Sequence, residues 1–567
     1  MSAPRISGLR PRTTDTGQRL ERNCGQRAGE PAEGGCDRFE PGASGGQVRI
    51  SYLPQDEGML APSEGLVETP GPGLRGARVR ISEAPNFAPV NPDPEGNYLF
   101  AQDDPRFDAA NCYYLTQRTL KMAEDYLGRS LSWGFAQELG RDWLLVHPHA
   151  GGQVANAFYN PDAGSLNFFY YQDPRTGEVV RTAQSADVVS HETGHALLDA
   201  LRHRYISSLS VGAGGFHESF GDMTAILAAL HDDKVVEALL AETRGDLGQP
   251  NIVARLAERL GQSQEVEKGR PAPESLRLAL NSHKYADMHF LPFVADDDNQ
   301  PGQESHQYSL LFTGAFYDIL VGLYQQAMAA RPGASAREHL AFARDTAGRL
   351  LFRGMEFAPV GDISYREAAL AMLTADRLDN EGAFRPLLEA VFTQRKILTP
   401  EDLEAFDRAW AALPDLRMPK NITTAKGALA FLEAHRKELG LPRSTAFEFL
   451  ESHANKAGET FVLYGSHRDV PLQGSEYGVL EGSKMRMNGG LLLAFGPDGR
   501  LRARTFDDIT DREIQDAMDH LRAAIAAGQI STDGDMTASP PGKGGLRVAL
   551  SSQPGGPVLR RSSLIWG

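Results

Sequence analysis

Residues 187–199, DVVSHETGHALLD, limit the possible folds and functions of this chain more than any other stretch does. Residues four apart lie on one face of a helix, so His191 and His195 would point their imidazoles at one place. This is the spacing with which a helix supplies two zinc ligands, and Glu192 beside them can reach a zinc-bound water. The alternative for the motif alone is a helix that carries two surface histidines.

The residues around this motif favour a buried helix. Ser185 is placed to act as its N-cap, and apolar residues recur along the segment: Val188, Val189, Leu197, Leu198 and Leu201. A buried helix with two inward histidines needs a third metal ligand from a neighbouring element.

Glu218 and Asp222 are four residues apart in the next segment, after a glycine-rich loop, and residues 223–230 continue that segment as a helix. Glu218 can bind the metal while Asp222 accepts the outer N–H of a ligating histidine and fixes its tautomer. Two histidines, one glutamate and an open fourth position are the ligand set of a catalytic zinc site. The alternative for Glu218 and Asp222 by themselves is a solvated helix face.

With these residues in place, the chain resembles the thermolysin family of zinc metallopeptidases (gluzincins) from about residue 85 to about residue 412. Residues 156–159 resemble the family's edge strand, residues 275–277 its arginine segment, and residues 306–317 the helix opened by its transition-state histidine, in the family's order. The resemblance implies an α+β fold of two lobes, an α+β N-terminal lobe and a mainly helical C-terminal lobe with the zinc helix between them. It also implies a hydrolase of the metalloprotease class that uses one catalytic zinc ion.

The resemblance assigns two transition-state donors besides Glu192, which it makes the general base. His306 would donate to the oxyanion that develops during peptide hydrolysis. Tyr205 would be the second donor, although it lies one residue short of the family's spacing.

The resemblance also assigns a substrate-binding set. Arg277 would bind the carbonyl beyond the scissile bond, and Asn156 and Ala157 would align the peptide as an added strand. Val188 and Leu276 would line an apolar side pocket, which predicts a hydrophobic residue after the cut bond.

Three positions depart from the family's pattern. His217 replaces the asparagine before the ligand glutamate, so its imidazole could hydrogen-bond His195 or compete for the metal. The acid that orients His306 could be Asp298 or Glu304. Calcium binding stays open, because Asp187 matches one calcium carboxylate of the family while the partner position is Ala229.

Composition narrows the function and the compartment. A net charge of −16 without a basic cluster argues against nucleic-acid binding as the main role. No stretch reaches the roughly 18 apolar residues of a membrane span, so no membrane partner is expected. The first residues have no apolar h-region, which predicts a cytoplasmic protein or one secreted without an ordinary signal peptide. Peptides or proteins are the expected substrates, and the oligomeric state is left open.

The expected domain organisation has five parts. Residues 1–45 should be a disordered leader, 46–205 the N-terminal α+β lobe with the zinc helix, and 206–412 the helical lobe. Residues 413–530 should form a small accessory α/β module, and 531–567 a disordered tail. Within these parts we expect short strands at 48–52 and 79–82 that could pair, and helices at 108–127, 251–260, 308–329, 336–351, 364–377, 444–457 and 511–527.

Two other functions fit the same residues. A degenerate relative could bind peptides or partner proteins without cutting them, which would suit His217 and the accessory module. Alternatively, the zinc chemistry could act on another amide or on a small peptide. The intact set of His191, Glu192, His195, Glu218 and His306 favours the endopeptidase.

Overall fold

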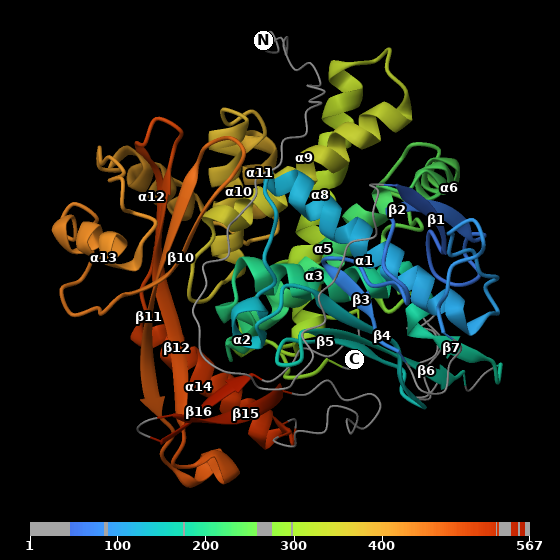
Figure 1. The fold of residues 1–567 in the computed structure, drawn as a ribbon. Helices are drawn as coiled ribbons and strands as arrows, with labels where there is room; N and C mark the ends of the chain where they lie inside the picture. Colours follow the sequence, from blue (N-terminus) through green and yellow to red (C-terminus); the bar gives the residue numbers. More distant parts are fainter. Residues whose placement is uncertain are drawn as a thin grey trace, which may run out of the picture.

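The computed structural model of this chain describes residues 46–83, 89–173, 176–257, 275–295, 299–528, 530–531, 546–553 and 556–561. These residues form a mixed α+β fold, as expected from the sequence (Figure 1). The expected leader, residues 1–45, lies outside the described residues. Within the described ranges, no helix is both long and apolar enough to cross a membrane.

A five-stranded sheet lies beside the helix that carries the histidine motif. Its strands are β3 (Val79–Ile81), β4 (Leu144–Gly152), β6 (Ser165–Gln172), β5 (Ala157–Asn160) and β7 (Val179–Arg181). β3, β4 and β6 are parallel, while β5 and β7 each pair antiparallel with β6. Among the described strands β5 pairs with β6 alone, so it forms an edge of the sheet.

A separate two-stranded sheet contains the first strand that was expected from the sequence. β1 (Gln47–Tyr52) pairs with β2 (Ser63–Glu68), while β3 pairs with β4. The expected pairing of residues 48–52 with 79–82 is therefore wrong. The two segments share a short alternating pattern, but such a pattern does not specify which strand is the neighbour.

Two helices connect this sheet to the rest of the fold. α1 (Pro105–Leu127) begins after Asp104, whose carboxylate accepts the backbone N–H of Arg106. α3 (Ala186–Leu201) begins after Ser185, the expected N-cap, whose hydroxyl accepts the N–H of Val188. α1 packs against α3, β3 and β4, and α3 packs against β5. The histidine motif is thereby fixed next to the edge strand.

The second half of the core is helical, as expected. α8 (Ser305–Ala330), α9 (Ala336–Phe357) and α10 (Tyr365–Asp379) contain the helices expected from the sequence. α5 (Val211–Leu230) begins earlier than expected, and the glycine-rich stretch is part of the helix, not a loop. The hydroxyl of Ser210 caps it by accepting the N–H of Ala213. A Cβ on Gly215 would lie 2.5 Å from the ring of Tyr308, so these glycines serve helix packing.

The expected helix at 251–260 is wrong over its described part. Residues 251–254 form a turn, and β8 (Arg255–Leu256) follows and pairs with β9 (Arg277–Leu278). The side chain of Asn251 accepts the N–H groups of Val253 and Ala254, which favours the turn over a helix. The remaining elements of this half are α2 (Ala136–Leu139), η1 (Thr182–Gln184), α4 (Arg204–Ser207), α6 (Asp233–Thr243), η2 (Met288–Phe290), α11 (Arg385–Gln394) and α12 (Pro400–Ala411).

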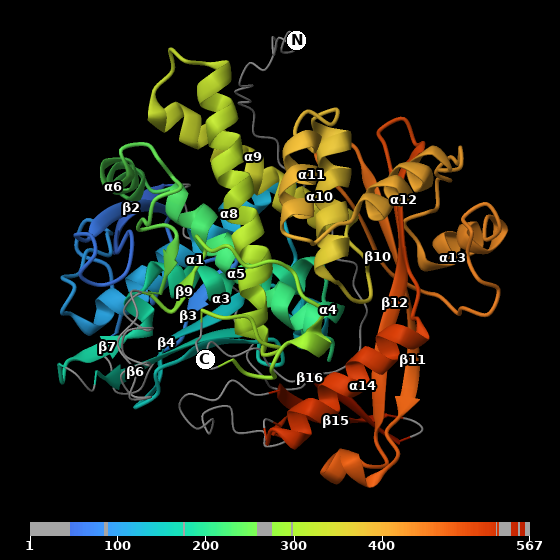
Figure 2. The same cartoon turned by 180° about the vertical axis from the view of Figure 1, so that it is seen from behind.

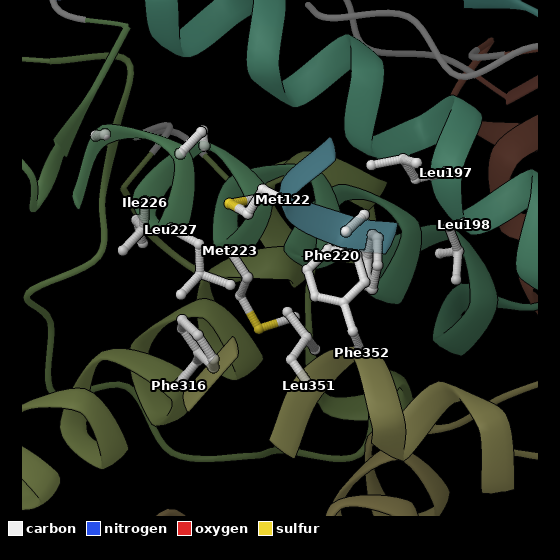
Figure 3. Packing of buried hydrophobic residues seen from close by; sticks show 14 of the residues in the cluster. Met122, Leu197, Leu198, Phe220, Met223, Ile226, Leu227, Phe316, Leu351 and Phe352 are labelled. Atoms are coloured by element: carbon white, nitrogen blue, oxygen red, sulfur yellow. The ribbon is translucent and has the colours of Figure 1, made fainter. Parts of the chain in front are cut away.

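One hydrophobic core joins the sheet half and the helical half. Phe220, Met223 and Leu227 of α5 belong to it, and Figure 3 shows Phe220 next to Phe352 of α9, with Met223 and Leu227 on the other side of Phe220. Burial of this apolar surface is the main favourable term that holds the helices together. The two halves share a continuous core around the motif.

The C-terminal part forms a second sheet beside the helical half (Figures 1 and 2). Its strand order is β10-β11-β12-β16-β15-β14, with β13 also paired to β12. We call residues 413–561 the C-terminal module. Its elements are α13 (Ala425–Ala434), β10 (Glu448–Ala454), β11 (Thr460–Pro471), η3 (Ser475–Leu480), β12 (Lys484–Phe495), β13 (Leu501–Asp507), α14 (Asp511–Ala526), β14 (Ile530–Ser531), β15 (Leu546–Gln553) and β16 (Gly556–Arg561).

Two expectations for this module are wrong. The expected helix at 444–457 is largely β10, because residues 448–454 pair with β11 and gain a partner that a local pattern does not reveal. The expected disordered tail, residues 531–567, contains β15 and β16, which pair with each other and join the sheet through β12. Residues 532–545, 554–555 and 562–567 lie outside the described residues.

Three carboxyl groups, one buried and two partly buried, lie where the module contacts the helical half. Asp507 of β13 accepts the backbone N–H of Asp362 at 3.1 Å, and Glu367 lies in the first turn of α10. Burial raises the pKa of Asp362 to about 6 and that of Glu367 to about 7, and it also raises the pKa of Asp507. The nearby carboxylate of Glu513 on α14 acts in the same direction.

These raised pKa values predict that stability falls as pH rises. The folded protein retains protons that the unfolded chain releases, so the contribution is full below pH 4 and is lost as pH passes about 6 to 7. In Asp362→Asn, the fall in the free energy of unfolding between pH 4 and 7 should be smaller by on the order of 1 kcal/mol. Urea unfolding between pH 4 and 8 measures this free energy. Glu404→Gln, on the exposed face of α12, should behave as the parent protein, and an equally steep Asp362→Asn curve would contradict the assignment.

Candidate metal centre

The close approach of α3 and α5 creates the site. A Cβ on Gly194 of α3 would lie 3.0 Å from Cα of Gly221 on α5, and a Cβ on Gly221 would lie 2.6 Å from the ring of His191. Glycine at both positions therefore allows the two helix backbones to come close together. This proximity brings the inward side chains of the two helices within reach of one another.

His191, His195 and Glu218 form a compact and fully buried group. The two Nε2 atoms lie 3.0 Å apart, and they lie 3.2 Å and 3.5 Å from the carboxylate oxygens of Glu218. Bonds of about 2.0–2.1 Å to a tetrahedral ion would place ligand atoms about 3.3 Å apart. Within the described part of the chain, these three are the one group of His, Cys, Asp or Glu whose ligand atoms cluster this closely.

The chemistry of the group fits a metal ion. Neither carboxylate oxygen of Glu218 has a hydrogen-bond partner in the part of the chain that the structure describes. Burial raises the pKa of Glu218 to about 7 and lowers the pKa of His191 and His195 well below the usual value. Neutral imidazoles with inward Nε2 atoms beside a carboxylate are the form in which these residues bind zinc.

Asp222 orients His191 as expected. Its Oδ1 lies 3.1 Å from Nδ1 of His191 and 2.9 Å from Nη2 of Arg277, and its Oδ2 accepts the hydroxyl of Thr313 at 3.1 Å. Because an ionised carboxylate can only accept hydrogen bonds, the contact with Asp222 places the imidazole proton on Nδ1 of His191. The Nε2 lone pair of His191 then faces Glu218.

His217 takes the corresponding position beside His195. The two Nδ1 atoms are 3.1 Å apart, and burial lowers the pKa of His217 to about 3. A neutral His217 can accept the Nδ1–H of His195, which leaves Nε2 of His195 for the metal. Of the two alternatives for His217, the structure has the hydrogen bond, and His217 lies outside the ligand group.

Glu192 lies beside the ligands and against the edge strand. It is fully buried, and neither of its carboxylate oxygens has a hydrogen-bond partner among the described residues. Burial and then the charge of Glu218 raise its pKa well above the usual value, while the backbone N–H of Tyr159 in β5 acts in the opposite direction. A buried carboxyl with raised proton affinity is suited to proton transfer.

His306 lies at the start of α8, next to the same glutamate. Its Nε2 is 3.3 Å from Oε2 of Glu218, and its Nδ1 is 2.6 Å from Oε1 of Glu304. Burial alone would lower its pKa, but the charges of Glu218 and Glu304 and the hydrogen bond to Glu304 raise it to about 9. Glu304 is therefore the orienting acid in the structure, whereas Asp298 lies outside the described residues.

Tyr205, the expected second donor, has a different partner. It lies in the short helix α4, is almost fully buried, and its hydroxyl donates to the backbone carbonyl of Pro359. No contact found for Tyr205 in the described chain joins it to the metal ligands. The hydroxyl is thus engaged in a structural hydrogen bond, and a catalytic role would require that bond to break.

The expected substrate-binding residues lie in three places: at the edge strand, beside Asp222 and in the main core. Asn156 and Ala157 lie at the start of the edge strand, where the Asn156 side chain accepts the N–H of Ala157. Arg277 is buried against Asp222. Val188 and Leu276 both belong to the main core, and the side pocket expected from them stays a prediction. The carboxylate of Asp187 accepts the N–H of Ala257, and calcium binding there stays open.

Comparison with protein-family models and with curated proteins finds no match for this chain. The resemblance to thermolysin-like enzymes therefore stays a prediction from the sequence motifs.

Three elements of the site escaped sequence reasoning. Thr313 binds Asp222 and follows His306 by seven residues on the same helix face, so helical periodicity could have indicated it. Gly194 lies between His191 and His195, Gly221 follows Glu218 by three residues, and the role of the two glycines in helix contact has no local signal. Arg561 donates to Ser305 from 256 residues away in the sequence, and only the fold brings it there.

Loss of the third ligand should release the metal. Glu218→Ala leaves the imidazole pair without a carboxylate, so zinc content per chain should fall to a small fraction of the parent value. Elemental analysis of purified protein measures this. Glu401→Ala, on the exposed start of α12, is the matched control and should keep full zinc content. An unchanged stoichiometry in Glu218→Ala would remove this residue from the ligand set.

Proposed function

We propose that this chain is a zinc-dependent endopeptidase of thermolysin-like type. The observation that carries the proposal is the convergence of His191, His195 and Glu218, with Glu192 buried beside them and next to an edge strand. Two histidines and one glutamate leave a fourth coordination position, which distinguishes a catalytic zinc site from a structural one.

Each residue has a defined role in this proposal. His191, His195 and Glu218 hold the ion, and Asp222 and His217 fix the ring orientation of the two histidines. Bound zinc supplies a Lewis acid that polarises a carbonyl and makes a nucleophile available near neutral pH. Glu192 accepts the proton of the attacking water and later delivers it to the leaving amine.

His306 would stabilise the negative charge that develops on the attacked carbonyl oxygen. Its pKa of about 9 keeps the imidazole protonated at neutral pH, and Glu304 holds Nδ1 so that Nε2–H points to the ligand group. A donor fixed before the reaction needs no reorganisation as charge develops. Because Tyr205 is bonded to Pro359, His306 carries this role in the proposal without help from the tyrosine.

Peptide substrates would bind along β5. The strand pairs only with β6 among the described strands, so its other edge can pair with an extended peptide. Asn156 and Ala157 at its start and Arg277 behind the ligands would align the backbone. A hydrophobic residue after the cut bond remains the proposed preference.

The full burial of the proposed ligands and of Glu192 favours a second candidate function. In it, a thermolysin-like protein binds a peptide or partner without cutting it. The ligands and Glu192 have no exposed surface. A substrate would therefore have to enter by movement of neighbouring elements. The buried carboxyl of Glu192 argues against a binding-only protein, because burial of an ionisable group is costly and is expected where function requires it.

Turnover should depend on the general base and on the metal separately. Glu192→Gln should keep zinc and lower kcat by about 10²–10⁴-fold, since the amide cannot accept the proton. Cleavage of casein and of fluorogenic peptides measures it. Chelation should abolish the parent activity and added zinc should restore it. Activity that survives in Glu192→Gln would contradict the mechanism, and absence of zinc-dependent cleavage in the parent would favour the binding-only candidate.

The donor at the start of α8 should affect the chemical step. His306→Ala should lower kcat by about 10²–10³-fold while KM and zinc content stay near the parent values, because the lost interaction forms in the transition state. Steady-state kinetics with one fluorogenic peptide measures both constants. Tyr205→Phe should have a much smaller effect on kcat. A larger loss in Tyr205→Phe than in His306→Ala would reverse the two assignments.

A further inference from the structure

The last strand of the C-terminal module reaches the metal centre. β16 pairs with β15 along its length and with β12, so the sheet fixes the position of its last residue. That residue is Arg561, which is 4% exposed. Its Nη1 donates to the hydroxyl of Ser305 at 3.1 Å, and its Nη2 donates to the backbone carbonyl of Ser210 at 3.3 Å.

These two serines start the two helices that matter most to the site. Ser210 caps α5, which carries Glu218, and Ser305 is the first residue of α8, directly before His306. One guanidinium thus links the first turns of both helices. Since a planar guanidinium offers several donors in a fixed geometry, it can hold two acceptors at a set separation.

Space for this guanidinium comes from a glycine one turn before the glutamate ligand. A Cβ on Gly214 would collide with Nη1 of Arg561 and would lie 2.6 Å from the hydroxyl oxygen of Ser305. The gap between α5 and α8 is therefore filled by a side chain from a strand that belongs to another part of the chain.

The guanidinium of Arg561 is buried in the fold. Among the described residues no carboxylate lies within 4.0 Å of it, and its Nε has no hydrogen-bond partner. Burial lowers its pKa to about 10, against the opposing charges of Glu218, Asp362 and Glu304. A buried cation with few partners is costly for stability, and such positions are expected where function requires them.

The module holds the start of α5 from a second side. Asp362 accepts the hydroxyls of Ser208 and Ser210 at 2.8 and 2.9 Å, and its own N–H donates to Asp507 of β13. Arg561 of β16 thus contacts Ser210 directly, and β13 is joined to it through Asp362. They link the module's sheet to the turn that begins the glutamate-bearing helix.

We infer that the C-terminal module is part of the catalytic site and that Arg561 is a positioning residue, which sets the first turns of α5 and α8 relative to each other. It acts on the separation of Glu218 and His306 through Ser210 and Ser305. The expected effect of Arg561 on kcat rests on the proposed peptidase function. The expected effect of Arg561 on the positions of α5 and α8 does not depend on any activity.

The test uses full-length protein with Arg561→Gln, Arg561→Lys and Ser305→Ala. Hydrogen exchange should become faster at residues 210–216 and 304–309 in Arg561→Gln and stay unchanged in the core of α9. With a fluorogenic peptide, kcat should fall by about tenfold to a hundredfold with KM and zinc content retained, because small displacements of reacting groups have effects of this size. Arg561→Lys should recover part of the loss, and Ser305→Ala should show a smaller loss.

Arg468→Gln is the matched control, because Arg468 is an exposed arginine of the same module that pairs with Asp511 at the surface. It should leave exchange and kcat unchanged. If Arg561→Gln does not fold, Gly214→Ala displaces the same guanidinium and should give the same pattern. Unchanged exchange at both segments would overturn the inference, and so would an increase in kcat, which would make Arg561 an inhibitory contact. If the parent cleaves no peptide, the proposed function fails, while the exchange comparison still decides the positioning role.

Discussion

The site depends on the close contact between α3 and α5. Gly194 and Gly221 bring the two helix backbones together, and the imidazoles of one helix then face the carboxylate of the other. A larger residue at either glycine would push the helices apart and separate donors that now lie 3.0–3.5 Å from one another. Close-packed interiors do not absorb such a change without moving their neighbours. Phe220 and Met223 flank Gly221 and Asp222 on α5, so their packing in the core also fixes the distances between the imidazoles and the carboxylate.

Asp222 joins several parts of the site in one place. It binds His191, Arg277 and Thr313, which come from three different elements. A carboxylate that accepts this many hydrogen bonds fixes the tautomer of the histidine and the position of the arginine together. His217 does the same for His195 with an imidazole. The fold itself thus orients the two histidines, which would reduce the ordering that metal binding requires.

The C-terminal module contacts the helices that carry the candidate metal centre. By sequence it looks separate from the metal centre, with its own helices and strands. In the fold its sheet packs on α9 and α10 through Phe461 and Leu492, and its last strand places Arg561 between α5 and α8. A residue of the C-terminal module therefore contacts the first turns of the two helices that carry Glu218 and His306.

The sequence by itself determined that His191 and His195 lie on one helix face, and local caps such as Ser185 set where that helix begins. It also gave the α+β class and most of the long helices, because these depend on local periodicity. Only the tertiary structure decided that residues 448–454 are a strand, that Tyr205 bonds to Pro359, and that Arg561 reaches Ser305. The reason is physical: strand pairing, helix contact and burial are set by partners distant in the sequence, and no local pattern specifies those partners.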